Sequence, residues 1–169
     1  MKTITHRLKR LAPQLAALII ILAAIAAISP GFLNLSFQNG RLYGSIIDIL
    51  VRAAPVALLT IGMTLVIATK GIDLSIGAVI AICGAVAATL ISGGHSIPTV
   101  IAISLAVGIA CGIWNGILVA MLDIQPIIAT LILMVAGRGI AQLITEGVIL
   151  TFNDDSFSAI GIGAFAGIP

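Results

Sequence analysis

The sequence predicts an all-α, polytopic bundle of about five transmembrane helices, and two observations support this fold class. The mean hydropathy of the 169 residues is +1.28, and 60% of them are hydrophobic whereas only 8% are charged. Soluble domains usually carry about 25% charged residues, so lipid rather than water must cover much of this chain. The second observation is a series of apolar runs, each near the roughly 20 residues that a helix needs to cross a bilayer core of about 30 Å.

Residues that favour turns separate these apolar runs. The runs cover residues 11–29, 46–69, 74–92, 99–122 and 127–145. Gly or Pro lies in each break between them, as expected of residues that end helices. A final apolar stretch from Ala159 is too short to span, and residues 153–156 are expected to form a polar loop.

The basic residues predict the orientation of the chain. A basic flank, residues 1–10, holds four of the eight Lys and Arg residues. If the N-terminus is cytoplasmic, Lys70 also lies inside, Arg41 is the only basic residue outside, and Asp154 and Asp155 lie outside. This distribution matches the positive-inside bias of membrane proteins.

Enzymatic, metal and nucleic-acid functions are not predicted. Residues 74–122 contain no Asp, Glu, Lys or Arg, so acid–base catalysis has almost nothing to use there. His6 and His95 are too few and too far apart for a metal site, and the basic flank is too short for nucleic acid. Cys83 and Cys111 are expected to be small buried hydrophobic residues, which could form a disulfide only if their helices face each other. We expect no catalytic residue, no metal and no cofactor.

Three glycines at every fourth position share one face of the fourth expected helix. They are Gly108, Gly112 and Gly116. Small residues let helix backbones approach closely in lipid, so the run predicts a tight helix–helix seam, with a mobile contact as the alternative. Asn115 lies beside this run, and an amide in a membrane must find partners or water. It either makes an interhelical hydrogen bond or lines a polar path.

Charged residues at membrane depth are costly and usually face the bundle interior or water. Asp48 and Arg52 are four residues apart on one helix face and could pair near its outer end. Arg138 stands between Gly137 and Gly139 inside an apolar run, where it needs an acidic partner or a cluster of carbonyls. Structural pairing and a place in a substrate path both stay open for Arg138.

The most distinctive segment is residues 69–77, with the sequence TKGIDLSIG. It is polar and contains glycine, and long apolar runs flank it on both sides. Asp73 can cap the following helix by accepting hydrogen bonds from its free backbone N–H groups. The alternative is a broken helix whose free backbone groups face a solute path, a device that transporters use.

This segment resembles a known signature. TKGIDLSIGA is similar to the GGIDLSVGA signature of sugar ABC-importer permeases of the ribose/xylose/arabinose type. AAPVALLTIGMTLVIAT before it and WNGILVAMLDIQPIIATLILMVAGRGIAQLITEG after it fit the same family. RLYGSIIDILVRAAPVALL together with ILTFN is most similar to permeases of galactofuranose importers. The resemblance covers about residues 40–155.

The resemblance implies that residues 1–169 are the N-terminal part of an ABC-importer permease domain in the bacterial inner membrane. The implied partners are a second permease subunit, a periplasmic sugar-binding protein, separate ATP-binding cassette subunits that hydrolyse ATP, and membrane lipid. Gly71, Asp73, Ser75 and Gly77 match the signature, and Gln125, Pro126 and Thr130 match the segment before the fifth helix. The candidate path residues for a monosaccharide, galactofuranose in particular, are Gly71, Asp73, Ser75, Asn115, Gln125, Thr130 and Arg138.

The chain departs from the family pattern in two respects. The family usually has Gly where this chain has Lys70, whose side chain would have to snorkel to the cytoplasmic interface. The chain is also about half the family's length, which predicts a truncated gene product or one part of a split permease. The alternative to a transporting subunit is therefore a truncated, non-transporting remnant or an assembly subunit.

Overall fold

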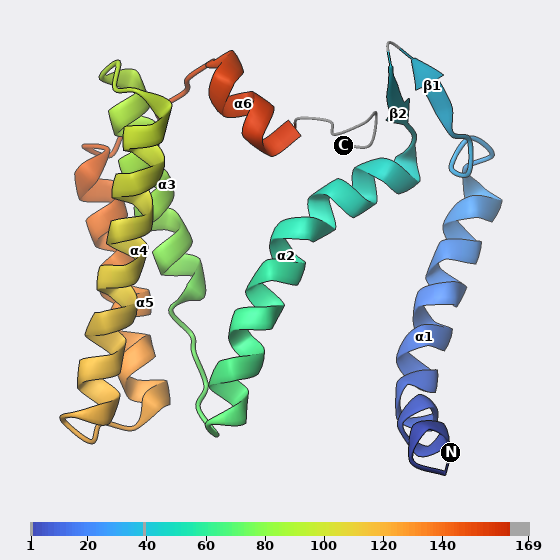
Figure 1. The fold of residues 1–169 in the computed structure, drawn as a ribbon, viewed down its shortest axis with the longest axis horizontal. Coiled ribbons are helices and arrows are strands. Elements are labelled where there is room, and N and C mark those ends of the chain that lie inside the picture. The colour runs from blue at the N-terminus through green and yellow to red at the C-terminus, as the bar shows by residue number, and fades with distance from the viewer. Residues whose placement is uncertain (1, 39, 163–169) are drawn as a thin grey trace. The chain divides into compact units, whose positions relative to one another are not determined.

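The computed structural model describes residues 2–38 and 40–162, and most of these residues are helical (Figure 1). The elements in chain order are α1 (Lys2–Ile28), β1 (Ser36–Gln38), β2 (Arg41–Tyr43), α2 (Ser45–Ala68), α3 (Ile76–Ser92), α4 (Ile97–Ala120), α5 (Pro126–Ile144) and α6 (Asp155–Ile162). Of these, α2, α4 and α5 are long and apolar enough to cross a membrane, while Ala12–Ile28 and α3 are shorter apolar helices. The predicted class of a helical chain with five apolar helices is confirmed. Helices α2 to α5 begin and end within two residues of the expected runs, whereas α1 begins at Lys2, within the predicted basic flank, rather than at residue 11.

Two local features differ from the all-helical expectation. A short antiparallel hairpin pairs β1 with β2, and its turn includes Gly40 with a φ of +76°, which glycine adopts at no steric cost. Residues 153 and 154 are non-helical, as the expected polar loop requires, but α6 begins at Asp155. The helix starts there because Asp154 Oδ1 accepts a hydrogen bond from the backbone N–H of Phe157 at 2.8 Å and so caps it. Strands of three residues are too short to show a hydrophobic period.

The chain divides into two compact units within α2. Among the described residues, the N-terminal unit contains α1, the hairpin and α2 as far as Pro55, and the main unit covers residues 56–162. A proline inside a helix removes one backbone hydrogen bond, so the division falls at a weak point of α2. Within the N-terminal unit Phe32 is buried at 6% exposure, beside an apolar hollow of about 260 Å³ between α1 and α2.

In the main unit α3 packs along both α4 and α5 (Figure 1). Its buried side chains are small or branched and include Ala78, Ile82 and Ala85. The closest approach is at Gly137 of α5, where an added Cβ would lie 2.9 Å from Ala78 Cβ and 3.1 Å from Ile82 Cδ1. Large apolar side chains cover the outer faces of all three helices, as expected of helices that face lipid.

The glycine run of α4 is not at a close seam within this chain. A Cβ added at Gly108 would lie 3.5 Å from Cys83 Sγ, an ordinary contact, and one added at Gly112 or Gly116 would meet no described atom within 4 Å. The close helix contact is instead formed by Gly137. A helix–helix seam, or a mobile contact, at the three α4 glycines stays a prediction.

Candidate functional site

The backbone leaves the helical conformation between α2 and α3. The N–H of Lys70 donates to Ile67 O at 2.9 Å, and the N–H of Gly71 donates to Val66 O at 3.0 Å. This pair of hydrogen bonds ends α2 in a Schellman motif, with Lys70 in the left-handed region at a φ of +60°. Residues 71–75 then run without helical structure to the start of α3 at Ile76.

The carboxylate of Asp73 organises this non-helical segment. Its Oδ1 accepts hydrogen bonds from the backbone N–H of Ser75 at 2.7 Å and from Ser75 Oγ at 2.6 Å. This is an Asx turn, and it corrects the expectation that Asp73 accepts from the free N–H groups of α3. Ser75, the N-cap residue of α3, makes no side-chain capping bond itself.

Side chains from α4 and α5 hold the same segment. Asn115 Nδ2 donates to Ser75 Oγ at 2.9 Å, and Ser75 is only 1% exposed. Thr130 Oγ1 lies 2.8 Å from Pro126 O and 3.2 Å from Ile72 O, so these two carbonyls share its single hydrogen. The segment is therefore fixed to both neighbouring helices at a depth inside the end of α4.

Helix geometry gives this depth. Asn115 precedes the last residue of α4, Ala120, by five residues, which is about 7.5 Å along the helix axis. The contact between Asn115 and Ser75 thus lies well inside the end of α4. Non-helical backbone at such a depth is tolerated only where protein buries it or where it lines a water-filled cavity.

A polar hollow of about 300 Å³ lies against this segment. It is lined by Val66, Thr69, Gly71, Ile72, Asp73, Gly112, Asn115, Gly116, Val119, Pro126 and Thr130. Asp73 also borders a neighbouring hollow of about 270 Å³ against the second half of α2. The carboxylate therefore stands between two cavities, half-buried, and is the only charged group lining either of them among the described residues.

Asn115 leaves one polar atom unsatisfied. Its Oδ1 is buried and has no hydrogen-bond partner among the residues that the structure describes. An orphaned buried acceptor costs about 1–3 kcal/mol, which a donor from a solute or from water would offset. Ser104 Oγ, further up α4, is unsatisfied in the same way but does not line the polar hollow.

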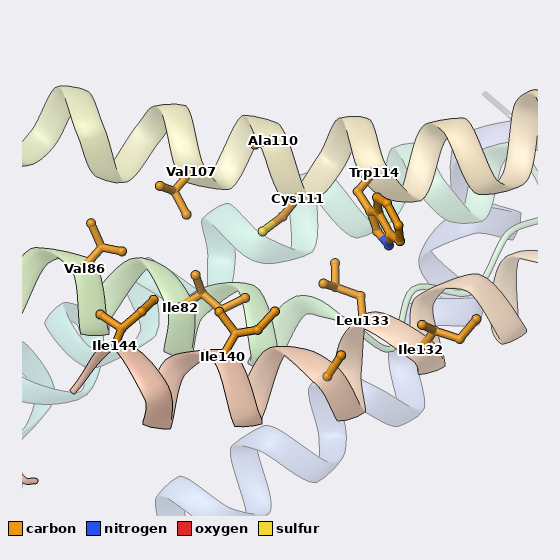
Figure 2. A pocket seen from close by; sticks show the side chains of 11 residues that line it. Ile82, Val86, Val107, Ala110, Cys111, Trp114, Ile132, Leu133, Ile140 and Ile144 are labelled. Carbon is orange, nitrogen blue, oxygen red and sulfur yellow. The ribbon is translucent and has the colours of Figure 1, made fainter. Parts of the chain in front are cut away.

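A second hollow of the main unit is apolar and larger, at about 510 Å³. Figure 2 shows Val107, Cys111 and Trp114 of α4 projecting into it across from side chains of α3 and α5. None of its lining residues is charged, and both Cys83 and Cys111 are free. Among the described residues that line this apolar groove, only the indole N–H of Trp114 and the thiol of Cys111 can make a side-chain hydrogen bond.

Residues 45–168 match the family described as branched-chain amino acid transport system / permease component. This match covers well over half of the chain. The chain belongs to this permease family. The prediction of a membrane transporter subunit rather than an enzyme is thereby confirmed, as is the resemblance to importer permeases.

The relatives of this permease chain include several sugar importers. It is 59% identical over 157 residues to the galactofuranose transporter permease protein of Escherichia coli, a match that covers 93% of the chain and 46% of the relative. It is 44% identical to the fructose import permease protein of Bifidobacterium longum, covering 79% of the chain and 38% of the relative. It is 39% identical to the ribose import permease protein of Haemophilus influenzae, covering 90% of the chain and 46% of the relative.

The permease chain therefore spans less than half the length of these curated relatives. No solved structure gives a significant match to it.

The structure brings most of the predicted path residues together. Gly71, Asp73, Ser75, Asn115 and Thr130 meet at the non-helical segment. Sequence reasoning did not place Gly112 and Gly116 in the lining of the permease hollow, although helical spacing sets Gly112 three residues before Asn115.

Two predicted path residues lie apart from this cluster. Gln125 is exposed at the N-cap of α5, where its carbonyl accepts from the N–H groups of Ile128 and Ala129. Arg138 is exposed on α5, and no described acidic group pairs with it. Roles for Gln125 and Arg138 in a path stay predictions.

The possible pair in α2 does not form. Asp48 and Arg52 are both exposed, and no ion pair joins them within the described part of the permease. Exposed pairs at this spacing contribute about 0.3–0.5 kcal/mol at most, so their separation costs the helix little.

Proposed function

We propose that this chain forms one part of the sugar-conducting path of an ABC importer, as the N-terminal part of a permease subunit in the bacterial inner membrane. The family match and the sugar-importer relatives support this proposal. Galactofuranose is the proposed substrate, because the Escherichia coli relative that is 59% identical carries that name.

The observation that carries the proposal is the non-helical segment at residues 71–75. It lies inside the end of α4, fixed by Asn115 and Thr130, and borders a polar hollow. Broken helices with free backbone groups near a central cavity are a recurring way to build a solute path in transporters. A purely structural membrane subunit has no comparable need for unpaired polar groups at this depth.

The proposed mechanism needs no chemistry from this chain. ATP hydrolysis by separate ATP-binding cassette subunits shifts the permease between an outward-open and an inward-open state. In each state the central cavity opens to only one side of the membrane. The hydroxyl, amide and carboxylate groups around the hollow offer hydrogen bonds that replace those of water as the solute passes. A periplasmic sugar-binding protein and a second permease subunit complete the proposed complex.

The proposed orientation places the N-terminus in the cytoplasm, following the bias of the basic residues. The C-terminal ends of α2 and α4 and the N-terminal end of α5 then lie on the cytoplasmic side. The polar hollow, which these ends surround, is on this proposal at the release end of the path.

A second candidate is a non-transporting membrane subunit or a remnant. The chain covers 46% of the Escherichia coli relative's length, and this candidate states that the matched part does not itself transport. The two candidates differ in whether the chain supports uptake when the missing length is supplied.

Reconstituted uptake tests both candidates. The chain is placed in proteoliposomes with the ATPase and the binding protein, with and without the remaining part of the Escherichia coli relative, and uptake of a labelled galactofuranoside is measured. We expect ATP-dependent uptake that Asp73→Leu abolishes and Ser104→Ala leaves unchanged. Absence of uptake in every combination, with the chain folded and associated with its partners, would favour the non-transporting candidate.

A further inference from the structure

The free oxygen of Asp73 is the first component of a binding subsite. Oδ1 of this carboxylate takes both donors that Ser75 offers, so Oδ2 has no hydrogen-bond donor among the described groups. Asp73 is half-buried and borders the polar hollow. A full negative charge therefore faces a cavity with half of its acceptor capacity unused.

The amide of Asn115 is the second component. One N–H of Nδ2 donates to Ser75 Oγ, whereas Oδ1 is buried and has no donor among the described residues. The Asn115 side chain, to which both atoms belong, borders the same hollow as Asp73. The side-chain amide also carries a second N–H. Because the terminal torsion of an Asn side chain has a broad minimum, a small rotation presents this acceptor and this donor together at the cavity wall.

Ser75 links the two components in a fixed geometry. Its Oγ accepts from Asn115 and donates to Asp73, and the side chain is almost completely buried. The only hydroxyl hydrogen of Ser75 is thereby consumed, as is that of Thr130 on backbone carbonyls. The hydroxyl hydrogen of Thr69, which also lines the hollow, is used on Val66 O. The second N–H of Asn115 is therefore the side-chain donor left beside the hollow. Oδ2 of Asp73 is the charged acceptor there without a donor, and Asn115 Oδ1 is a buried acceptor without one.

This combination selects among small solutes by chemistry. A hydroxyl group both donates and accepts, so two neighbouring hydroxyls satisfy a carboxylate oxygen and both atoms of an amide. A phosphorylated sugar would bring its anionic group close to Asp73, where like charges repel. A metal cation would meet only one charged ligand and an amide N–H that opposes it, and the described residues contain no cluster of metal-binding side chains.

We propose that Asp73 and Asn115, spaced by Ser75, form a binding subsite for a pair of neighbouring hydroxyl groups on an uncharged sugar or polyol, and that the subsite rejects phosphorylated sugars. The proposal rests on the proposed transport function and assigns recognition within the path to two named side chains. It makes Ser75 a positioning residue, because its hydroxyl group is used in hydrogen bonds to Asp73 and Asn115.

Equilibrium binding to the purified chain in lipid nanodiscs tests the subsite without requiring transport. Methyl galactofuranoside is the probe, and its binding is followed by saturation-transfer NMR. We expect saturable binding to the unmodified chain and none of a galactose phosphate. Asp73→Asn keeps the acceptor of the Asx turn and Asn115→Leu removes the amide, and each should weaken binding at least about tenfold, since hydrogen bonds at a charged or buried group are lost.

Ser104→Ala is the matched control, because it deletes an unsatisfied hydroxyl on the same helix outside the hollow. It should bind the probe like the unmodified chain. Helix content and a monodisperse elution profile are checked for every variant, and Asp73→Asn, the near-isosteric change, decides the result if Asn115→Leu does not fold.

The proposal is overturned by unchanged affinity in Asp73→Asn, by equal binding of the galactose phosphate, or by no binding to the unmodified chain. Uptake in proteoliposomes without such binding leaves the transport function standing and removes this subsite. Binding of the probe without uptake in any combination supports the subsite and removes the transport function.

Discussion

The two hollows beside α4 and α5 differ more in chemistry than in size. The apolar groove has about 510 Å³ and is lined by aliphatic side chains with Cys111 and Trp114, whereas the polar hollow has about 300 Å³ and contains Asp73, Asn115 and Thr130. Lipid tails are as apolar as the groove itself, so lipid can fill the groove without loss. Buried polar groups need partners that lipid cannot supply. In a membrane protein the demand for hydrogen bonds, more than cavity volume, marks a solute path.

The largest change in stability should come from a substitution at the close contact between α3 and α5, beside the apolar groove. Gly137→Val places a side chain where even a Cβ would lie 2.9 Å from Ala78 Cβ, so α3 and α5 must separate. We expect a loss of about 2–3 kcal/mol in the free energy of unfolding, as for overpacked cores, measured by thermal unfolding in detergent.

Gly139→Val is the matched control for this change, because a Cβ at Gly139 meets nothing within 4 Å. Helix propensity favours Val over Gly by a few tenths of a kcal/mol, so this variant should be as stable as the unmodified chain or slightly more stable. Similar losses for both variants would mean that α3 and α5 are not closely packed at Gly137.

The next effect tests the attachment of the non-helical segment to α5. Thr130→Val keeps the shape of the side chain and removes the hydroxyl that Pro126 O and Ile72 O share. Because Thr130 is only 5% exposed, we expect the free energy of unfolding to fall by about 1–2 kcal/mol. Amide hydrogen exchange should become faster, and residues 71–75 should lose their protection first.

Thr64→Val serves as the comparison, since that hydroxyl is exposed and bonds only to Thr60 O within its own helix. It should change stability by less than about 0.5 kcal/mol. If Thr64→Val and Thr130→Val behave alike, the segment does not depend on α5.

A smaller change, a gain in stability rather than a loss, is expected from a substitution at the end of α2. Lys70 adopts a left-handed conformation with a φ of +60°, which costs a residue with a Cβ about 1–2 kcal/mol relative to glycine. Lys70→Gly should therefore stabilise the chain by about 0.5–1 kcal/mol after the greater entropy of the unfolded chain is counted. The midpoint of thermal unfolding measures the change.

Lys70→Ala separates conformation from charge, because it removes the ammonium group and keeps the strained backbone. We expect no stabilisation from it. A gain equal to that of Lys70→Gly would show that the charge, and not the left-handed backbone, is the unfavourable feature of this position.

The smallest perturbation probes what fills the apolar groove. Trp114 is the only tryptophan in the chain and lines this groove at 51% exposure. Lipids with brominated tails should quench its fluorescence without changing the fold, and lipids brominated near the headgroup should quench it much less. A Trp114 that neither lipid quenches would mean that protein, not lipid, covers the groove.

Much of the fold follows from local sequence. The apolar runs and the turn residues between them predict the five long helices, because helix length and helix ends depend on neighbouring residues. The break at residues 69–77 is equally visible, since polar residues and glycine interrupt the longest apolar region. The hairpin and α6 were missed because three-residue strands and a one-Asp cap leave little periodic signal.

The sequence by itself determined that this chain has the apolar helices of a membrane permease family and a polar break between two of them. Only the tertiary structure decided which polar groups meet there: Ser75 and Asn115 are 40 residues apart, and Ile72 and Thr130 are 58 apart. It also moved the close glycine contact from α4 to Gly137 and left Arg138 outside the cluster. The reason is physical, because polar residues are sparse on α4, and a helix without a continuous polar face carries little local signal of its rotation toward its neighbours.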